Sequence, residues 1–515
     1  MSSTLVRRIC LSKLDHHAFI LIVVLSLISP AAAQRFKTVV EFNGTEGGNP
    51  DNTSLVEGAD GNYYGTAAYG GNYDCNPHFE GGCGTVFRMT PEGQFETLYT
   101  FCLQTGCPDG GIPAGGLVLG LDGNFYGTTS YGGTNCREVL GDLDDCGTVY
   151  KITPEGQLTT LHTFCTKSGC PDGAASYASL FLAADGNFYG TTSEGGQDKT
   201  GTVFKITPTG TLTTLTSFTS GNGMYPISPL VEGPDGNFYS TTLEGGNQNN
   251  YCYDGCGSAF KMTPSGTVTF LYVFCVEVVE CPDGAEPLGG LTIGNDGNLY
   301  GTTSYPTGSV FKLTPQGQLT TIYKFPCVST GCPVGPMPSG PLTIATDGNF
   351  YGTAQQGGTG TCVNVLGCGV VYQLTPSGTQ TLIHDFQGTD GSAPLFGVSQ
   401  TTLGYFVGTA FEGAIDGPCF DAQLGCGTVF AFSTGLGPSV TFVNNPGLVG
   451  QTVGILGHGL TGTTVVSFHG VAASFSVVSD TYITATVPAG ATSGYVDVST
   501  PLISLRSNRP FLVLR

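Results

Sequence analysis

An acidic residue followed directly by glycine recurs in five loops of the chain, and its carboxylate is the first group that could do chemistry. Several carboxylate oxygens gathered at one point would bind a hard cation such as Ca²⁺. The same dipeptide forms a tight turn without any ion, because the acidic side chain caps nearby backbone N–H groups. The sequence leaves both interpretations open. The five acidic residues are Glu46, Asp109, Asp172, Asp283 and Asp390.

Tyrosines and glutamates stand in a second set of loops, most of them just before a glycine. The tyrosines could stack on sugar rings, and glutamates paired at a defined separation could hydrolyse a glycoside. The sequence does not supply that separation, so simple decoration of surface loops is the alternative. No Ser/His/Asp or histidine-cluster spacing occurs, and we assign no catalytic residue. The candidate ligand-binding residues are Tyr69, Tyr131, Glu194, Glu244, Tyr251, Tyr253 and Glu412.

The cysteines come in local pairs. Cys10 apart, 18 of the 19 cysteines fall into nine pairs, and a loop that lacks one partner always lacks both. Zinc needs four ligands, whereas each loop offers two cysteines with hardly any histidine nearby. We therefore predict disulfides and an oxidising compartment. The predicted bonds join Cys75 to Cys83, Cys102 to Cys107, Cys136 to Cys146, Cys165 to Cys170, Cys252 to Cys256, Cys275 to Cys281, Cys327 to Cys332, Cys362 to Cys368 and Cys419 to Cys426.

These loops join the strands of a repeated unit. Each unit has an apolar strand, D-G-N-[aromatic]-Y-G-T-T, a glycine-rich loop, G-T-V-[FY]-K-[IL]-T-P-x-G and L-T-T-L-x-x-F. This pattern predicts four antiparallel strands, A to D, joined by tight turns between A and B and between C and D. In the second copy we expect strands at 116–120, 124–130, 148–153 and 158–164. Four-strand units of 50–63 residues are typical of propeller blades.

The two ends of the repeat region complete each other. The D-G-N triplet begins at six positions from Asp60 to Asp347, and a degraded seventh copy ends after strand C. An orphan strand D lies at Phe36–Phe42, and the residues after it align with Gln387–Gly391. Pairing this strand with the last copy would leave no open edge. The fold class we predict is all-β: a seven-bladed β-propeller over residues 34–435, closed by an N-terminal strand.

The predicted ring has two different faces. The A–B and C–D turns form one face, which we name the turn face. The B–C and D–A loops form the other, which carries every cysteine pair and which we name the cysteine-loop face. Because binding sites concentrate on ordered loops held by a rigid scaffold, we expect ligand binding on the cysteine-loop face.

The N-terminus and the charge limit the location and the partners. Residues 1–33 combine Arg7, Arg8 and Lys13 with a short apolar stretch and Ala31-Ala32-Ala33, a pattern typical of a signal peptide. The net charge is −21, and removing these residues leaves −23, which excludes nucleic acid as the expected partner. We expect an exported chain without a transmembrane segment, at the cell surface, in the periplasm or in the medium. The composition leaves its oligomeric state open.

Two family resemblances follow from these motifs. Residues Asp185–Leu215 carry D-G-N-F-Y-G-T-T-S…G-T-V-F-K-I-T-P-x-G-x-L-T-T-L almost intact, and this phrase resembles the GloVer (Gloeobacter/Verrucomicrobia-type) tandem repeat. That resemblance implies an exported repeat protein and no particular reaction. Residues 437–515, with V-G-Q-T-V-G-I-L-G-H-G-L and V-V-S-F-H-G-V-A-A, resemble an IPT/TIG domain, which implies an immunoglobulin-like β-sandwich.

These observations together favour a non-enzymatic binding or structural protein. Its expected ligand is a glycan, a cell-envelope component or a protein, met through the cysteine-loop face, and Ca²⁺ is the one cofactor that the acid-glycine loops suggest. The alternative is a secreted propeller enzyme that acts on a polysaccharide or on a small ester or lactone. The fold alone does not choose between them.

Overall fold

The structure is a computed structural model, and its described part is built from β-strands and turns without a helix. It describes residues 35–514 except 52–53, 74, 76–80, 137–145, 222, 247–251, 276–280, 327–336, 363–366, 415–418 and 420–423. The predicted signal peptide therefore lies outside the described residues. Within them, no helix long and apolar enough to cross a membrane is found.

Seven four-stranded antiparallel sheets occupy residues 35–433 of the described chain. Six of them run along the chain as strands A to D. They are β2–β5 (Val56–Glu57, Tyr63–Ala67, Thr85–Met89, Phe95–Thr100), β6–β9 (Val118–Leu119, Phe125–Thr129, Thr148–Ile152, Leu158–Thr163), β10–β13 (Phe181–Leu182, Phe188–Thr192, Thr202–Ile206, Leu212–Ser217), β14–β17 (Val231–Glu232, Phe238–Thr242, Ser258–Met262, Val268–Val273), β18–β21 (Leu291–Ile293, Leu299–Thr303, Ser309–Leu313, Leu319–Lys324) and β22–β25 (Thr343–Ile344, Phe350–Ala354, Val370–Leu374, Gln380–Asp385).

The seventh sheet takes its outer strand from the N-terminus. Its strands A to C are β26 (Ser399–Gln400), β27 (Phe406–Ala410) and β28 (Thr428–Ser433), and β1 (Arg35–Glu41) pairs antiparallel with β28. The pairing skips one residue of β1 between Thr38 and Val40. Strand D of each of the other six sheets shows the same irregularity at the same register. Thus β1 occupies the place of strand D, as the sequence predicted.

Aromatic residues join neighbouring sheets. The tyrosine of the D-G-N-[aromatic]-Y motif stacks on an aromatic residue of the next sheet's strand B, as in Tyr64 on Phe125, with ring centroids 4.0 Å apart. The same arrangement recurs at four further interfaces. Strand B is buried along its whole length, whereas strand D is half exposed. The apolar core therefore lies along strands B and C and between the sheets.

The last sheet also contacts the first. Phe42, which directly follows β1, packs against Phe87 and Phe95 of the first sheet, at centroid distances of 5.5 and 5.6 Å. The Glu57 carboxylate accepts a hydrogen bond from the N–H of Thr402 at 3.0 Å. Strand A of one sheet lies against strand A of the next, as β2 does against β6. The sheets consequently form a closed ring with strands A at its centre.

The turn face is built from a repeated hydrogen-bond cage. In the second sheet the Asp122 carboxylate accepts from the Asn124 N–H (3.2 Å), from Asn124 Nδ2 (2.7 Å) and from the Tyr126 hydroxyl (2.9 Å). Six sheets carry this cage, and their Tyr hydroxyl to Asp oxygen distances are 2.8–3.0 Å. The D-G-N aspartates are therefore turn formers, each with its acceptor oxygens used within its own sheet.

Residues 440–514 form two further four-stranded sheets around a separate apolar core that includes Val453, Phe468 and Val498. Their strand orders are β29-β31-β35-β34 and β33-β32-β36-β37, and a short pair, β30-β38, lies beside them. This region has ten strands. They are β29 (Thr441–Phe442), β30 (Gly447–Leu448), β31 (Thr452–Leu456), β32 (Val465–Phe468), β33 (Val471–Ala472), β34 (Phe475–Val477), β35 (Tyr482–Thr486), β36 (Val496–Ser499), β37 (Ser504–Arg506) and β38 (Val513–Leu514).

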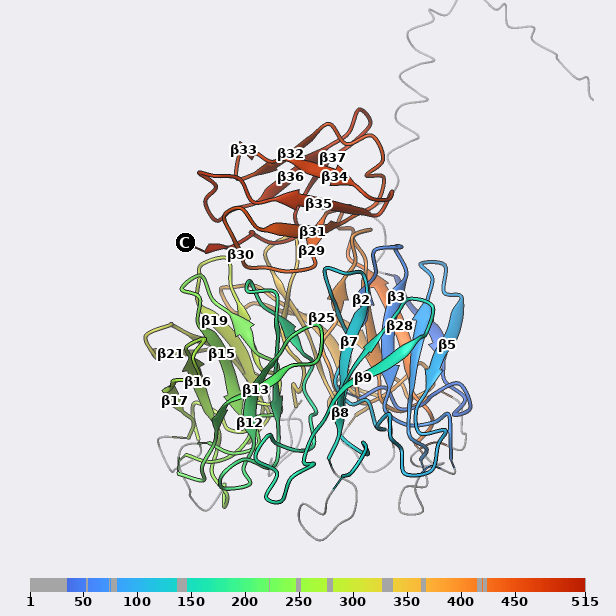
Figure 1. Cartoon of the computed structure of the whole chain (residues 1–515), viewed down its shortest axis with the longest axis vertical. Helices are drawn as coiled ribbons and strands as arrows, with labels where there is room; N and C mark the ends of the chain where they lie inside the picture. The colour runs from blue at the N-terminus through green and yellow to red at the C-terminus, as the bar shows by residue number, and fades with distance from the viewer. Residues whose placement is uncertain are drawn as a thin grey trace, which may run out of the picture.

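These C-terminal sheets lie across the turn face of the ring, at the top of the view in Figure 1. The Thr481 hydroxyl donates to the carbonyl oxygen of Ala59 at 2.6 Å, and Gln451 Nε2 donates to that of Ala184 at 2.7 Å. Leu456 and Tyr482 pack into the same apolar cluster as Leu119 and other residues of the ring. The turn face is thus partly covered, and the cysteine-loop face points the other way.

Candidate functional site

The cysteine-loop face is closed loop by loop with local disulfides. Eight of the nine predicted pairs are bonded, and their partners are 4–10 residues apart in sequence. The bonds join Cys75 to Cys83, Cys102 to Cys107, Cys136 to Cys146, Cys165 to Cys170, Cys252 to Cys256, Cys275 to Cys281, Cys362 to Cys368 and Cys419 to Cys426.

The ninth predicted pair lies in a loop outside the described residues. Cys327 and Cys332 both fall within residues 327–336, outside the described residues, so a bond between Cys327 and Cys332 stays a prediction. Because each of the eight observed bonds closes one loop, the disulfides stiffen the individual loops and do not link distant sheets.

The acid-glycine carboxylates turn outward, toward strand D. Asp109 Oδ2 accepts from the Tyr99 hydroxyl at 2.8 Å and from the Cys102 N–H at 3.0 Å. The other sheets repeat this contact with a different donor on strand D. The donors are the His162 imidazole for Asp172 (2.9 Å), the Tyr272 hydroxyl for Asp283 (2.8 Å) and the His384 imidazole for Asp390 (2.7 Å), whereas Glu46 accepts from Asn43 Nδ2 at 3.0 Å.

These dipeptides do not form a ring at the centre. Four of the five backbone carbonyls accept from a threonine at the start of strand C of the next sheet, as Asp109 does from Thr148 at 3.3 Å. Each acidic residue therefore lies between an outer strand and its neighbour, away from strands A. Among the described residues, no three of these carboxylates come close enough to share an ion. These hydrogen bonds are those expected of the turn-forming interpretation, and cation binding by these residues stays a prediction.

Asp390 shows the electrostatic consequence of this arrangement. Its partial burial opposes the charged form, but the hydrogen bonds from His384 and from the Gln387 N–H (2.8 Å) outweigh that effect and lower the pKa of its carboxyl. The carboxylate is consequently held in its charged form, in which its hydrogen bonds join the D–A loop to His384 on strand D.

Most of the other candidate residues occupy one equivalent position in the ring. This position pairs, through a backbone bridge, with the D–A loop that leads into strand A. It therefore surrounds the central mouth of the cysteine-loop face, and we name this set the mouth ring. Its members are Tyr69, Tyr131, Glu194, Glu244, Tyr305 and Glu412. We did not predict Tyr305, although its place before Pro306 in the fifth copy matches that of Tyr69 in the first.

The members of the mouth ring differ in exposure. Tyr131 is only 4% exposed and packs beside Cys83 and Gly111, so it cannot stack on a ligand, contrary to our expectation. Tyr69 is half-buried, and burial is the main reason that the pKa of its hydroxyl is raised. Tyr253, beside the ring in a B–C loop, is 89% exposed. Tyr251 lies outside the described residues.

Acidic groups gather on one side of the mouth, over the third to fifth sheets. Burial raises the pKa of the Glu244 carboxyl, and the charges of Asp254 and Glu286 raise it further. Burial together with the charges of Glu244, Glu194 and Asp254 raises the pKa of the Tyr225 hydroxyl. We name Glu194, Tyr225, Glu244, Asp254 and Glu286 the acidic cluster. We did not predict Tyr225, Asp254 and Glu286. Aligning the copies of the repeat would have placed these residues in the loops around the mouth of the cysteine-loop face.

Residues with left-handed backbone line the mouth without being glycines. Ile112 has φ 51°, a rare value for a β-branched residue. Three backbone hydrogen bonds hold it: its N–H donates to Cys83 O (2.9 Å), and its carbonyl accepts from the N–H groups of Ala114 (2.8 Å) and Ser130 (3.1 Å). Such backbone persists only where the surrounding structure enforces it, and it clusters at functional sites. The equivalent residues are Asn49, Ala175, Tyr225, Glu286 and Ala393, at φ 48–54°.

The second cysteine of each B–C loop disulfide fixes this backbone. Its side chain is fully buried, and its carbonyl accepts the N–H of the left-handed residue in the adjoining D–A loop at 2.7–3.0 Å. The B–C loop disulfides therefore help to fix the left-handed residues that line the mouth. These cysteines are Cys83, Cys146, Cys256, Cys368 and Cys426, which accept from Ile112, Ala175, Glu286, Ala393 and Asn49 in that order.

The loops of neighbouring sheets lock together beside these residues. Gly84, at φ 90°, ends a B–C loop, and a Cβ there would lie 2.5 Å from Pro113 Cδ of the next D–A loop. This close approach explains why the motif has glycine immediately before T-V-[FY]. The mouth is consequently a rigid frame that carries variable side chains.

Comparison with known families identifies the repeat. The model of the Gloeobacter/Verrucomicrobia repeat matches residues 27–144 and 139–333. The chain belongs to the Gloeobacter/Verrucomicrobia repeat family. No curated protein matches this family member.

Solved structures resemble this Gloeobacter/Verrucomicrobia repeat protein only distantly. A luciferin-regenerating enzyme is 14% identical over 62% of this chain and 92% of its own, with a TM-score of 0.39. A gluconolactonase from Xanthomonas campestris is 11% identical over 56% and 78%, with a TM-score of 0.34. A protein from Bacteroides thetaiotaomicron is 13% identical over 78% and 76%, with a TM-score of 0.39. Likeness at this level carries no argument about what the repeat protein does.

The chemistry available at the mouth follows from its groups. Carboxylates of the acidic cluster accept hydrogen bonds from hydroxyl or amine groups, and the exposed Tyr253 ring offers a flat apolar face. In the described residues of the repeat protein, the close groups of metal-ligating type are two sets of three cysteines. Both sets consist of disulfide sulfurs, so neither has a free thiolate for a metal.

Proposed function

We propose that the seven sheets are the blades of one β-propeller spanning residues 34–435, followed by an immunoglobulin-like IPT/TIG domain at 437–515. The closed ring of four-stranded sheets and the use of β1 as the last outer strand support the propeller. Two facing sheets around one core support the sandwich. Residues 1–33 act as a signal peptide in this proposal, and the eight local disulfides favour an oxidising, extracytoplasmic location.

The protein is a non-enzymatic binding protein that recognises a glycan or another cell-envelope component through its cysteine-loop face. One observation carries this proposal: the C-terminal sheets contact Ala59 and Ala184 on the turn face, which leaves the cysteine-loop face open. The open face also holds the side chains that vary from copy to copy. A rigid, disulfide-closed frame loses little conformational entropy when it binds a ligand.

The acidic cluster and Tyr253 are the recognition residues. Sugar hydroxyls donate to carboxylates, and sugar rings stack on exposed tyrosine. Burial raises the pKa of the Glu244 carboxyl, and the negative charges of Asp254 and Glu286 raise it further. A neutral or cationic ligand therefore fits this side of the mouth better than an anionic one, because each added negative charge is repelled.

The mature chain is applied to an array of bacterial and plant cell-wall oligosaccharides and to washed cell envelopes, with and without Ca²⁺. We expect binding to at least one of these probes, and a loss of tenfold or more on Tyr253→Ala and on Glu244→Gln. The matched control is Glu155→Gln, which makes the same change at an exposed position in a turn between strands C and D. Binding to neither probe, or equal losses for Glu155→Gln and Glu244→Gln, contradicts the proposal.

A further inference from the structure

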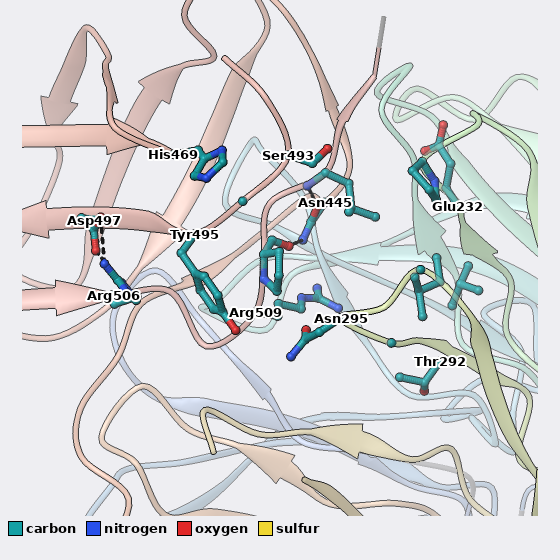
Figure 2. Close-up of a pocket in the computed structure, with 18 of the residues that line it drawn as sticks. Glu232, Thr292, Asn295, Asn445, His469, Ser493, Tyr495, Asp497, Arg506 and Arg509 are labelled. Atoms are coloured by element: carbon teal, nitrogen blue, oxygen red, sulfur yellow. Dashed lines mark hydrogen bonds and ion pairs between the residues drawn. The ribbon is translucent and has the colours of Figure 1, made fainter. Parts of the chain in front are cut away.

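A large cavity lies between the ring and the C-terminal sheets, on the side of the molecule opposite the cysteine-loop face. Its volume is about 810 Å³, within the range of roughly 300–1,000 Å³ that is usual for small-molecule sites. Glu232, Thr292 and Asn295 of the ring line one side, and His469, Tyr495 and Arg509 of the C-terminal sheets line the other (Figure 2). The site exists only because the two parts meet.

Arg509 is the unusual residue of this cavity. Its side chain is exposed to the cavity, beside Asn295 in Figure 2. It also lines an adjoining cavity of about 260 Å³ with Glu57 and Gln400 of the inner strands. Among the described residues, no hydrogen bond or ion pair to the Arg509 guanidinium is found. A guanidinium that is exposed to a cavity and has no paired anion can bind an anion supplied by a ligand.

The backbone holds Arg509 firmly in this place. Asn445 Nδ2 donates to the Pro510 carbonyl at 2.9 Å, and the Leu512 N–H donates back to Asn445 Oδ1 at 2.8 Å. The Ser507 hydroxyl donates to the carbonyl of Arg509 itself at 2.7 Å. The guanidinium is therefore carried on a fixed segment, which suits it to orient a ligand.

Glu232, Arg506 and Asp497, which also line the cavity, each have a hydrogen-bond partner. Arg506 Nε donates to Asp497 Oδ1 at 2.8 Å and lies over the Tyr495 ring, 5.6 Å from its centroid. Glu232 Oε2 accepts from the Ala184 N–H at 2.8 Å. Burial raises the pKa of the Glu232 carboxyl to about 7, so much of it is uncharged near neutrality. Arg509 is the charged side chain of this cavity for which no partner is found among the described residues.

We propose that this cavity binds a small carboxylate, an acidic sugar of one or two residues, with Arg509 as its charge anchor. A guanidinium binds a carboxylate through two parallel N–H···O bonds. A monoanion balances the single unmatched charge, whereas a phosphate dianion would leave excess negative charge beside Glu232 and Asp497. Thr292 and Asn295 supply neutral polar groups that suit the sugar hydroxyls.

Calorimetric titration of the mature full-length chain with galacturonate tests the proposal, with glucose and inorganic phosphate as comparison ligands. We expect galacturonate to bind, and both glucose and phosphate to bind at least tenfold more weakly. Arg509→Gln should weaken galacturonate binding by about 10- to 100-fold, the usual size of a hydrogen-bonded charge pair. The matched control Arg88→Gln removes an arginine that pairs with Glu96 outside the cavity, and it should change galacturonate binding less than threefold.

A second variant keeps the test decisive if Arg509→Gln fails to fold. Asn295→Asp places a negative charge beside Arg509 at an exposed position, and we expect it to abolish galacturonate binding without loss of the fold. No galacturonate binding by the wild type, phosphate binding as tight as galacturonate binding, or equal losses for Arg88→Gln and Arg509→Gln would each overturn the proposal. Because the cavity is on the turn-face side, these outcomes are independent of binding at the cysteine-loop face.

Discussion

The two faces of the ring use their polar residues in opposite ways. On the turn face, each D-G-N aspartate is occupied by Asn and Tyr donors of its own sheet, six times over, and the C-terminal sheets cover part of the result. On the cysteine-loop face, one position of the mouth ring holds tyrosine or glutamate, according to the copy. Repeated residues build the scaffold, and residues that vary within a fixed frame are the ones available for recognition.

Closure of the ring supports both faces, so breaking it has the largest expected effect. Phe42 is 1% exposed and joins the end of β1 to the first sheet. Phe42→Ala should lower the free energy of unfolding by about 3–5 kcal/mol, measured by urea denaturation. Leu103→Ala, at a 70% exposed position, is the control and should change little. A loss below about 1 kcal/mol for Phe42→Ala would mean that β1 does not close the ring.

The local disulfides should contribute to stability on the cysteine-loop face only. Replacing both Cys165 and Cys170 by alanine opens a loop of five-residue separation and should cost about 2 kcal/mol by the loop-entropy model. We expect unchanged hydrogen exchange at the turn face, because each bond closes a single loop. Slower refolding with scrambled pairing, or no loss of stability at all, would count against this assignment.

Substitution of two aspartates distinguishes a structural role of the loop carboxylates from a metal-binding role. Asp122→Ala and Asp109→Ala each remove a carboxylate that accepts two or more hydrogen bonds, one on each face. Both should lower the melting temperature, with losses of about 1–3 kcal/mol. Added Ca²⁺ should not raise the melting temperature of the wild type. A Ca²⁺-dependent increase that Asp109→Ala removes would restore the cation site.

Acid should weaken the turn face slightly. Burial opposes the charge on Asp235, but Lys261 at 2.8 Å, together with Asn237 and Tyr239, lowers the pKa of its carboxyl to about 2. A carboxyl whose pKa is lower in the folded state contributes stability above its unfolded pKa near 4, and this contribution is lost as the pH falls toward 2. Lys261→Met should flatten the stability profile between pH 4 and 2 by less than about 1 kcal/mol. A steeper profile in the variant would contradict this assignment.

The sequence predicted the parts whose contacts are local or repeated. The F-K-T-V-V-E-F segment has the alternation of a strand D, so the position of β1 could be predicted by aligning it with the other copies. The disulfide partners could be predicted because the two cysteines of each pair lie in the same loop. The outward turn of Asp109 was missed, although Tyr99 on strand D offered a signal that recurs as His162 and Tyr272. Tyr131 was taken as exposed because its burial depends on the neighbouring sheet.

The docking of the C-terminal sheets could not be predicted. Thr481 and Gln451 donate to backbone carbonyls of Ala59 and Ala184, and a carbonyl is present at every residue, so such contacts leave no pattern in the sequence. The cavity beside Arg509 follows from this docking and was equally hidden. A lone arginine near the end of a chain has no distinguishing spacing.

Hydrogen–deuterium exchange of the mature chain, with and without the tightest-binding oligosaccharide of the array, tests the central claim most directly. We expect slower exchange around residues 252–257 and 282–288, the loops that carry Tyr253, Asp254 and Glu286, and no change in the turns at 59–62 and 122–124. Protection confined to those turns, with the cysteine-loop face unaffected, would contradict it.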